Sequence, residues 1–216
     1  MKKHLKALLA LILAFTLSGG AKFRMTYDVD KNGNLTGTIA TLYSMRAIES
    51  FNPGMTDVDR EELLSALKEE MQESYPDATI TYVSEGEGKD AYAGYIVSGI
   101  TEIEGIEIAK EGFKLTLKYP IVKVAETLAQ ENGLTQYSTN LLVENGFEAT
   151  VDFNMPGKPE SNIGEITGNT VHIDLLDLPA GVNTAIITCS VFPLIPVTVG
   201  GGVLILLVII LALRKK

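Results

Sequence analysis

The last 26 residues, VFPLIPVTVGGGVLILLVIILALRKK, limit what this chain can fold into more than any other stretch. The 23 residues from Val191 to Leu213 carry no charge, and Arg214, Lys215 and Lys216 follow them. A helix needs about 20 apolar residues to cross a hydrocarbon core about 30 Å thick. In lipid a helix also pairs its own backbone polar groups, which a loop cannot do. The run therefore predicts a transmembrane helix, because the alternative, a buried core helix, rarely has more than about 14 apolar residues.

The charges around this segment predict its orientation. Positively charged residues next to a membrane span favour the cytoplasmic side. We therefore expect residues 214–216 to be a cytoplasmic basic tail and residues 191–213 to span the cell membrane once. The residues before Val191 then lie outside the cytoplasm.

The N-terminal stretch, MKKHLKALLALILAFTLSGGAKF, is consistent with export. Lys2, Lys3 and Lys6 form a cationic start, residues 7–17 are apolar, and small residues follow. This is the layout of a secretory signal peptide, and the apolar part is short for a membrane span. We predict a signal peptide over residues 1–20, with an uncleaved N-terminal anchor as the alternative.

The portion between these two segments, residues 21–190, has the length of one domain with its own core. It contains all 27 acidic residues but only 12 of the 18 basic ones, which gives a net charge of −15. Such a surface repels phosphate backbones, so nucleic acid is excluded as a partner. The single cysteine, Cys189, cannot form an internal disulfide.

Several stretches alternate apolar and polar residues with the period of a β-strand. Residues 22–29 do so, an Asn32-Gly33 turn follows, and residues 35–45 read as the return strand of an antiparallel hairpin. Further strands are expected over residues 78–83, 92–103, 106–119, 146–155, 170–175 and 183–190. Residues 161–169 are expected to be a polar return.

Two helices interrupt these strands. Leucines and a methionine recur at helical spacing from Asp57 to Ser74, and Pro76 follows, so this range predicts a long amphipathic helix with an acidic outer face. A shorter helix is expected from Pro120 to Asn132-Gly133. Strands with two helices in separate insertions predict an α+β domain with an antiparallel, meander-like sheet.

One sequence motif raises the question of a metal. Residues 28–33, DVDKNG, match the first half of a calcium loop, but Ile39 stands where the loop needs a bidentate glutamate. The same stretch already serves as the expected hairpin turn. We therefore predict no metal and no cofactor.

Catalytic patterns are also incomplete. The exported portion has one histidine, His172, which lacks the second imidazole or thiol that a zinc site with Cys189 would need. No nucleophile elbow accompanies any serine, so a Ser-His-Asp hydrolase has no sequence support. Carboxylate pairs such as Glu102 and Glu104 are expected by chance in so acidic a domain, and a glycosidase pair stays open. The glycine-rich residues 85–89 lack the context of a phosphate loop. We predict no catalytic residue and no enzymatic activity.

The chain resembles the LppM-type family of bacterial lipoproteins in three features. These are a lipobox-like export signal followed by Lys22-Phe23-Arg24, a single membrane helix near the C-terminus, and the segment Met155-Pro156-Gly157-Lys158 to Gly164-Glu165-Ile166-Thr167-Gly168-Asn169-Thr170-Val171. The sequence departs from the family where Gly20 replaces the lipidated cysteine and where His172 replaces an aromatic position. Without that thiol nothing can be acylated, so the C-terminal helix must provide the anchor.

The resemblance implies an extracytoplasmic α+β domain with an apolar cavity between a helix and a curved sheet, which binds lipid or glycolipid. No catalytic residues come with it. The apolar residues that would line such a cavity are Leu63, Leu67, Met71, Phe113, Leu115, Leu117, Phe147 and Val151. The same residues could instead form a dry, close-packed core. In that case the domain would be a scaffold that binds another envelope protein.

Overall fold

The computed structural model describes residues 20–51, 56–101, 103, 105–121, 143–144, 146–179 and 181–191. The strands are β1 Ala21–Val29, β2 Leu35–Ser44, β3 Thr79–Glu85, β4 Tyr92–Ile100, β5 Glu107–Glu111, β6 Lys114–Pro120, β7 Glu148–Asn154, β8 Pro159–Ser161, β9 Glu165–Thr167, β10 Thr170–Asp174 and β11 Thr184–Ser190. The helices are α2 Met45–Phe51, α3 Asp57–Ser74 and a 3₁₀ turn, η1 Gly88–Asp90. This confirms the predicted α+β class.

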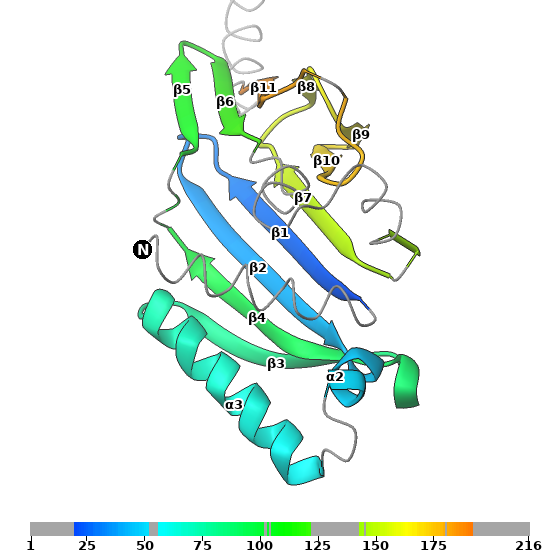
Figure 1. Cartoon of the computed structure of the whole chain (residues 1–216). Coiled ribbons are helices and arrows are strands. Elements are labelled where there is room, and N and C mark those ends of the chain that lie inside the picture. The colour runs from blue at the N-terminus through cyan, green and yellow to red at the C-terminus, as the bar shows by residue number, and fades with distance from the viewer. Residues whose placement is uncertain are drawn as a thin grey trace, which may run out of the picture.

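The main sheet has seven strands in the order β3-β4-β2-β1-β7-β10-β9 (Figure 1). Strands β1 and β2 form the predicted hairpin, but β1 pairs with β7 in parallel. The other described strand pairs are antiparallel, so the prediction of an antiparallel, meander-like sheet was wrong for the β1–β7 pair. Parallel neighbouring strands need a long crossover connection. Here the chain forms all the elements from β2 to β6 before β7 pairs with the edge of β1 opposite β2.

A second sheet of four strands, in the order β5-β6-β11-β8, was not predicted as a separate sheet. The single strand expected over residues 106–119 is divided into the β5–β6 hairpin by a turn at Gly112 and Phe113. Gly112 has a φ of +60°, which glycine adopts without the strain that a side chain adds. The polar return expected over residues 161–169 holds the short strand β9 and the end of β8.

Strand β1 gives the main sheet two different faces. Met25, Tyr27 and Val29 are buried on one face, while the side chains of Lys22 and Arg24 point to the other. The register extends both faces across the sheet, because residues that pair directly lie on the same face. We call the first the apolar face and the second the charged face.

Helix α3 has the bounds that the sequence predicts and packs near β3 and β4. Leu64, Leu67 and Met71 are buried on its inner side, and its acidic side chains Glu61, Glu62, Glu69 and Glu73 are exposed. Helix α2 was not predicted. It begins directly after β2, where the backbone N–H of Met45 donates to the carbonyl oxygen of Ala91 at 2.8 Å.

Three predicted segments fall outside the described part of the chain. The helix expected from Pro120 to Gly133, the signal peptide over 1–20 and the transmembrane helix over 191–213 lie wholly or almost wholly outside the described residues. Among the helices that are described, none has the length and apolarity to cross a membrane.

The two sheets meet at an aromatic cluster. Tyr27 of β1, Phe153 of β7 and Tyr119 of β6 have ring centroids 5.3 to 6.2 Å apart. Burial raises the pKa of Tyr119 to about 12, so its hydroxyl stays protonated at neutral pH. A separate contact lies at the β1–β2 turn, where Gly33 approaches Ile108 and Leu115 of the second sheet. The described strands therefore share one hydrophobic core.

Gly94 allows β2 and β4 to approach each other closely. A Cβ atom at this position would lie 2.0 Å from the carbonyl oxygen of Thr41 and 3.0 Å from the Cα of Leu42. Both are backbone atoms, so no side chain can rotate away to make room.

We predict that Gly94→Ala destabilises the fold by about 3 kcal/mol, the upper part of the range for overpacked sites, because β2 and β4 must separate. Thermal unfolding of the full chain in detergent, followed by circular dichroism, measures the loss. The control is Gly168→Ala, an open position with a φ of +60°, which should cost only about 1 kcal/mol. Equal losses in the two variants would show that the close approach is not the cause.

Candidate functional site: the apolar face of the main sheet

Most of the residues predicted to line a cavity are buried. Leu67 and Met71 lie on α3, Leu115 and Leu117 on β6, and Phe147 and Val151 on or just before β7, and all six are buried. Leu63 is partly buried against the same core. The structure therefore places seven of the eight candidates in or against the hydrophobic core.

Phe113 is the exception. It lies in the β5–β6 turn and is 57% exposed. The alternation of the sequence put it in line with Leu115 and Leu117, on the assumption that the strand is continuous. The turn at Gly112 removes Phe113 from that alternation, so its placement among the buried residues was wrong.

The predicted set does not surround one space. Helix α3 lies at one end of the main sheet and β6 at the other (Figure 1). Leu115 and Leu117 belong to the second sheet. Leu67 and Met71 instead belong to α3, which contacts β3 and β4 of the main sheet. The candidate residues are therefore separate parts of one elongated core.

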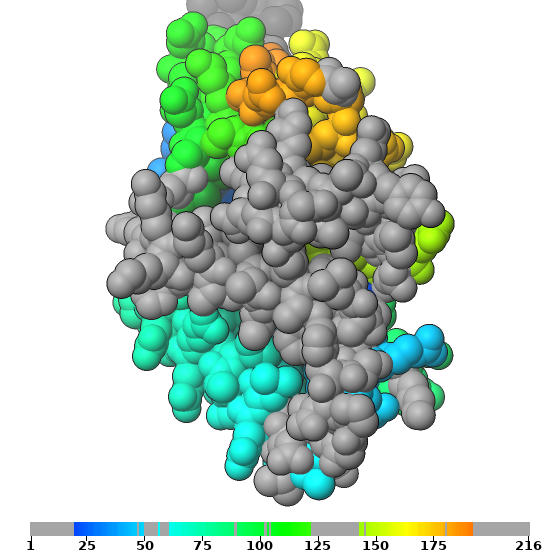
Figure 2. Space-filling view, viewed as in Figure 1, coloured from blue at the N-terminus to red at the C-terminus, as the bar shows by residue number. Residues whose placement is uncertain are grey.

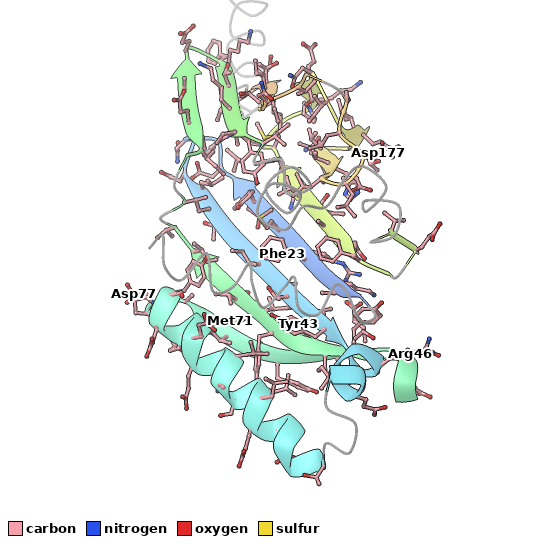
Figure 3. The ribbon with its side chains drawn as sticks, viewed as in Figure 1. Phe23, Tyr43, Arg46, Met71, Asp77 and Asp177 are labelled. Carbon is pink, nitrogen blue, oxygen red and sulfur yellow. The ribbon has the colours of Figure 1, made fainter. Side chains whose placement is uncertain are left out.

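The apolar face between these two ends is the better candidate surface. Phe23 on β1 and Ile39 on β2 lie on the two central strands and are only partly buried. Tyr43 of β2 lies on the same face, and Figure 3 shows it, with Met71 of α3, nearer the α3 end of the sheet than Phe23. Because Phe23 and Ile39 keep part of their surface accessible, they offer an apolar contact for an extended ligand that lies along β1 and β2.

The sequence contained a signal for this surface. Phe23 lies within the alternating stretch of residues 22–29 and Ile39 within the expected return strand of residues 35–45, but neither was selected as a candidate site residue. Period-two alternation shows which face a residue occupies. It does not show which two of the strands become central.

The charged face carries an ion-pair network that joins three strands. Arg24 donates to both carboxylate oxygens of Glu148 on β7, and its Nη1 lies 2.7 Å from Glu85 on β3. The Nζ of Lys22 donates to Glu85 at 2.9 Å and lies 4.3 Å from the centroid of the Tyr92 ring. Two cations thus face two carboxylates, which leaves this cluster with no excess charge to attract an anion.

The network also covers an apolar residue. Leu42 of β2 lies on the charged face, where it pairs with Lys22 and Gly94, and it is buried. The hydrogen bond from Lys22, followed by the one from Arg24, lowers the pKa of Glu85 below its usual value of 4.5. The bidentate bond to Glu148 contributes most to the raised pKa of Arg24. We interpret this cluster as structural.

His172 has one close carboxylate. Its Nδ1 lies 2.7 Å from Oδ1 of Asp152, and Glu165 pairs with it across β9 and β10. The side chain of His172 is 45% exposed, and no hydrogen bond from a serine to it is seen in the described part of the chain. Within that part, no group of three histidine, cysteine or acidic residues could hold a metal ion. The Asp152–His172 pair supplies no nucleophile by itself.

The calcium-like motif forms a hydrogen-bonded turn. Both carboxylate oxygens of Asp30 accept hydrogen bonds from the backbone and side chains of Asn32 and Asn34. The bond from the Asn34 backbone is the main cause of the lowered pKa of Asp30. These oxygens are used within the turn.

A depression of about 170 Å³ lies elsewhere, at the end of the second sheet where β5 begins, β6 ends and β11 begins. Gly105, Glu107, Lys118, Pro120 and Thr184 line it. Glu107 and Lys118 pair across it at 3.7 Å. A space this small does not suit an acyl chain.

We predict that Glu85 contributes to stability in a pH-dependent way. Because its pKa is lowered in the folded state, its contribution is complete above about pH 4.5 and is lost as the pH falls through the lowered value. Glu85→Gln should therefore flatten the decline in unfolding free energy between about pH 6 and pH 3. At neutral pH it should cost less than about 1 kcal/mol, because the pair is partly exposed.

Urea unfolding of the full chain at several pH values provides this measurement. Glu87→Gln changes a neighbouring exposed carboxylate in the same way and serves as the control. If both variants kept the slope of the unchanged chain, the network would not act in the acid range.

Comparison with known proteins adds one structural likeness. No family model and no curated protein matches the sequence. The NMR structure of the folded domain of LppM from Mycobacterium tuberculosis matches with 11% identity and a TM-score of 0.41. The match covers 82% of this chain and 94% of that domain. At this degree of similarity it carries no conclusion about function.

Proposed function

We propose that this chain is a membrane-anchored, extracytoplasmic binding module that holds an acyl chain or a glycolipid on the apolar face of its main sheet. The observation that carries the proposal is the position of the last strand. Strand β11 ends at Ser190, and the backbone N–H of Val191 donates to the carbonyl oxygen of Phe113 at 2.7 Å. The fold thus continues to the first residue of the charge-free run, with no linker between them.

The sequence at both ends supports the anchored arrangement. The run from Val191 to Leu213 is long enough to span a bilayer, and the cations after it favour the cytoplasmic side. The cationic and apolar start of the chain supports export. All carboxylates then lie on the exported side.

The division of the main sheet supports a lipid-like ligand. The charged face uses its cations in ion pairs with Glu85 and Glu148, whereas the apolar face presents Phe23 and Ile39. Burying apolar surface contributes about 25 cal/mol for each Å² removed from water. An acyl chain gains this energy on the apolar face without separating an ion pair.

A second candidate function is a scaffold that binds another envelope protein. The observation in its favour is the packing of the predicted lining residues, because Leu115, Leu117 and Val151 have no exposed surface. On this proposal the exposed acidic side of α3 would contact a basic partner.

We predict that removing residues 191–216 releases the protein from the membrane. The full chain should stay with the membrane pellet after alkaline carbonate washing and should be cut by protease added to intact cells. The shortened chain should appear in the soluble exported fraction. A full chain extracted by carbonate, or one protected from external protease, would contradict the anchored arrangement.

We predict that a fatty acid carrying a photoreactive diazirine labels peptides from β1 and β2 in the full chain. Phe23→Ser should reduce that labelling, because it removes apolar surface from the central strand. Thr26→Ser, on the opposite face of the same strand, is the matched control and should leave labelling unchanged. Mass spectrometry of the digested chain locates the label.

Labelling confined to the peptide of residues 191–216 would contradict lipid binding by the domain. Labelling of β1 and β2 that is equal in both variants would show that the apolar face is not the binding surface. If the domain stays unlabelled and instead cross-links to another envelope protein in cells, the scaffold function is favoured.

A further inference from the structure

We propose that the tip of the β5–β6 hairpin is a second membrane contact, in which the Phe113 side chain inserts into the lipid headgroup region beside the anchor. This inference rests on the proposed anchoring of residues 191–213. It adds a surface of the folded domain that contacts the bilayer. This contact determines the orientation of the domain relative to the bilayer.

The position of Phe113 relative to the anchor is the first argument. Its carbonyl oxygen accepts a hydrogen bond from the backbone N–H of Val191, the first residue of the charge-free run. Ser190 pairs with Lys114, the residue after Phe113. A helix that enters the membrane from Val191 therefore brings this turn to the bilayer surface.

The chemistry of the tip is the second argument. Phe113 is one of five exposed large apolar side chains among the described residues, and at 57% it is the most exposed of them. It lies between Gly112 and Lys114 in a turn. An aromatic ring next to a lysine suits the membrane interface, where apolar side chains insert about 5–10 Å and cations contact headgroups.

The charge of the second sheet is the third argument. Its four strands contain three lysines and three glutamates and so have no net charge. The exported portion as a whole carries −15. The domain therefore meets the least electrostatic repulsion from an anionic bilayer when this sheet faces the bilayer. Helix α3, in contrast, presents exposed carboxylates. Figure 2 shows α3 and the β5–β6 hairpin at opposite ends of the molecule.

Tryptophan fluorescence tests this contact directly, because the chain contains no tryptophan. Phe113→Trp makes the residue at the tip the only reporter, and its exposed position leaves room for the larger ring. The full chain is reconstituted into vesicles of phosphatidylcholine and phosphatidylglycerol, with and without brominated phosphatidylcholine. The tip lies beside the anchor, so both orientations of the chain in the vesicle place it at a bilayer surface.

We expect the emission of the Phe113→Trp variant to shift to shorter wavelength in vesicles and to be quenched by the brominated lipid. Thr81→Trp is the matched control, because Thr81 is exposed on β3 of the other sheet and lies on its charged face, away from the proposed lipid surface. Its emission should stay unshifted and unquenched.

Two failures are distinguishable. If the chain stays with the vesicles during flotation but the Phe113→Trp variant emits and is quenched like the Thr81→Trp variant, the tip contact is wrong and the anchor stands. If the chain does not float with the vesicles, the anchor itself is wrong, and the tip contact that rests on it is overturned with it.

Discussion

The alternation of side chains along β1 underlies the architecture of the main sheet and of both its faces. This strand lies between β2 and β7 and sends alternate side chains to two faces of different character. Met25 and Tyr27 enter the core on one face, and Lys22 and Arg24 form ion pairs on the other. A shift of one residue in its pairing would place Arg24 in the core and Met25 in the network. Burying an unpaired guanidinium costs several kcal/mol, so the register is strongly determined.

The network on the charged face joins segments that are far apart in the chain. Glu85 ends β3, Arg24 belongs to β1, and Glu148 begins β7. Because Arg24 donates to both acids, it joins the edge strand β3 and the parallel strand β7 to the centre of the sheet. Individually these partly exposed pairs contribute little to stability. Together they cover Leu42 and keep charged groups away from the apolar face.

The second sheet has a different role, because it connects the main sheet to the end of the folded domain. Strand β11 pairs with β6 and leads directly to Val191. Its inner residues Ala185, Ile187 and Cys189 are buried, and burial raises the pKa of the Cys189 thiol. Every residue of β11 pairs with a residue of β6, so the last described strand is fixed to the second sheet along its whole length.

Residue spacing alone predicted part of the local structure. Helical spacing and the proline after it predicted α3 with its observed bounds, and period-two alternation with an Asn-Gly turn predicted the β1–β2 hairpin. These features depend only on neighbours in the chain. The turn at Gly112 is also local, but alternation did not reveal it, and it leaves Phe113 exposed while Leu115 is buried. Contacts between distant segments instead established that β7 pairs with β1 in parallel. The pairing of β1 with β7 and the network around Arg24 join residues more than 60 positions apart, which no local pattern encodes, because each strand's alternation is compatible with several partners.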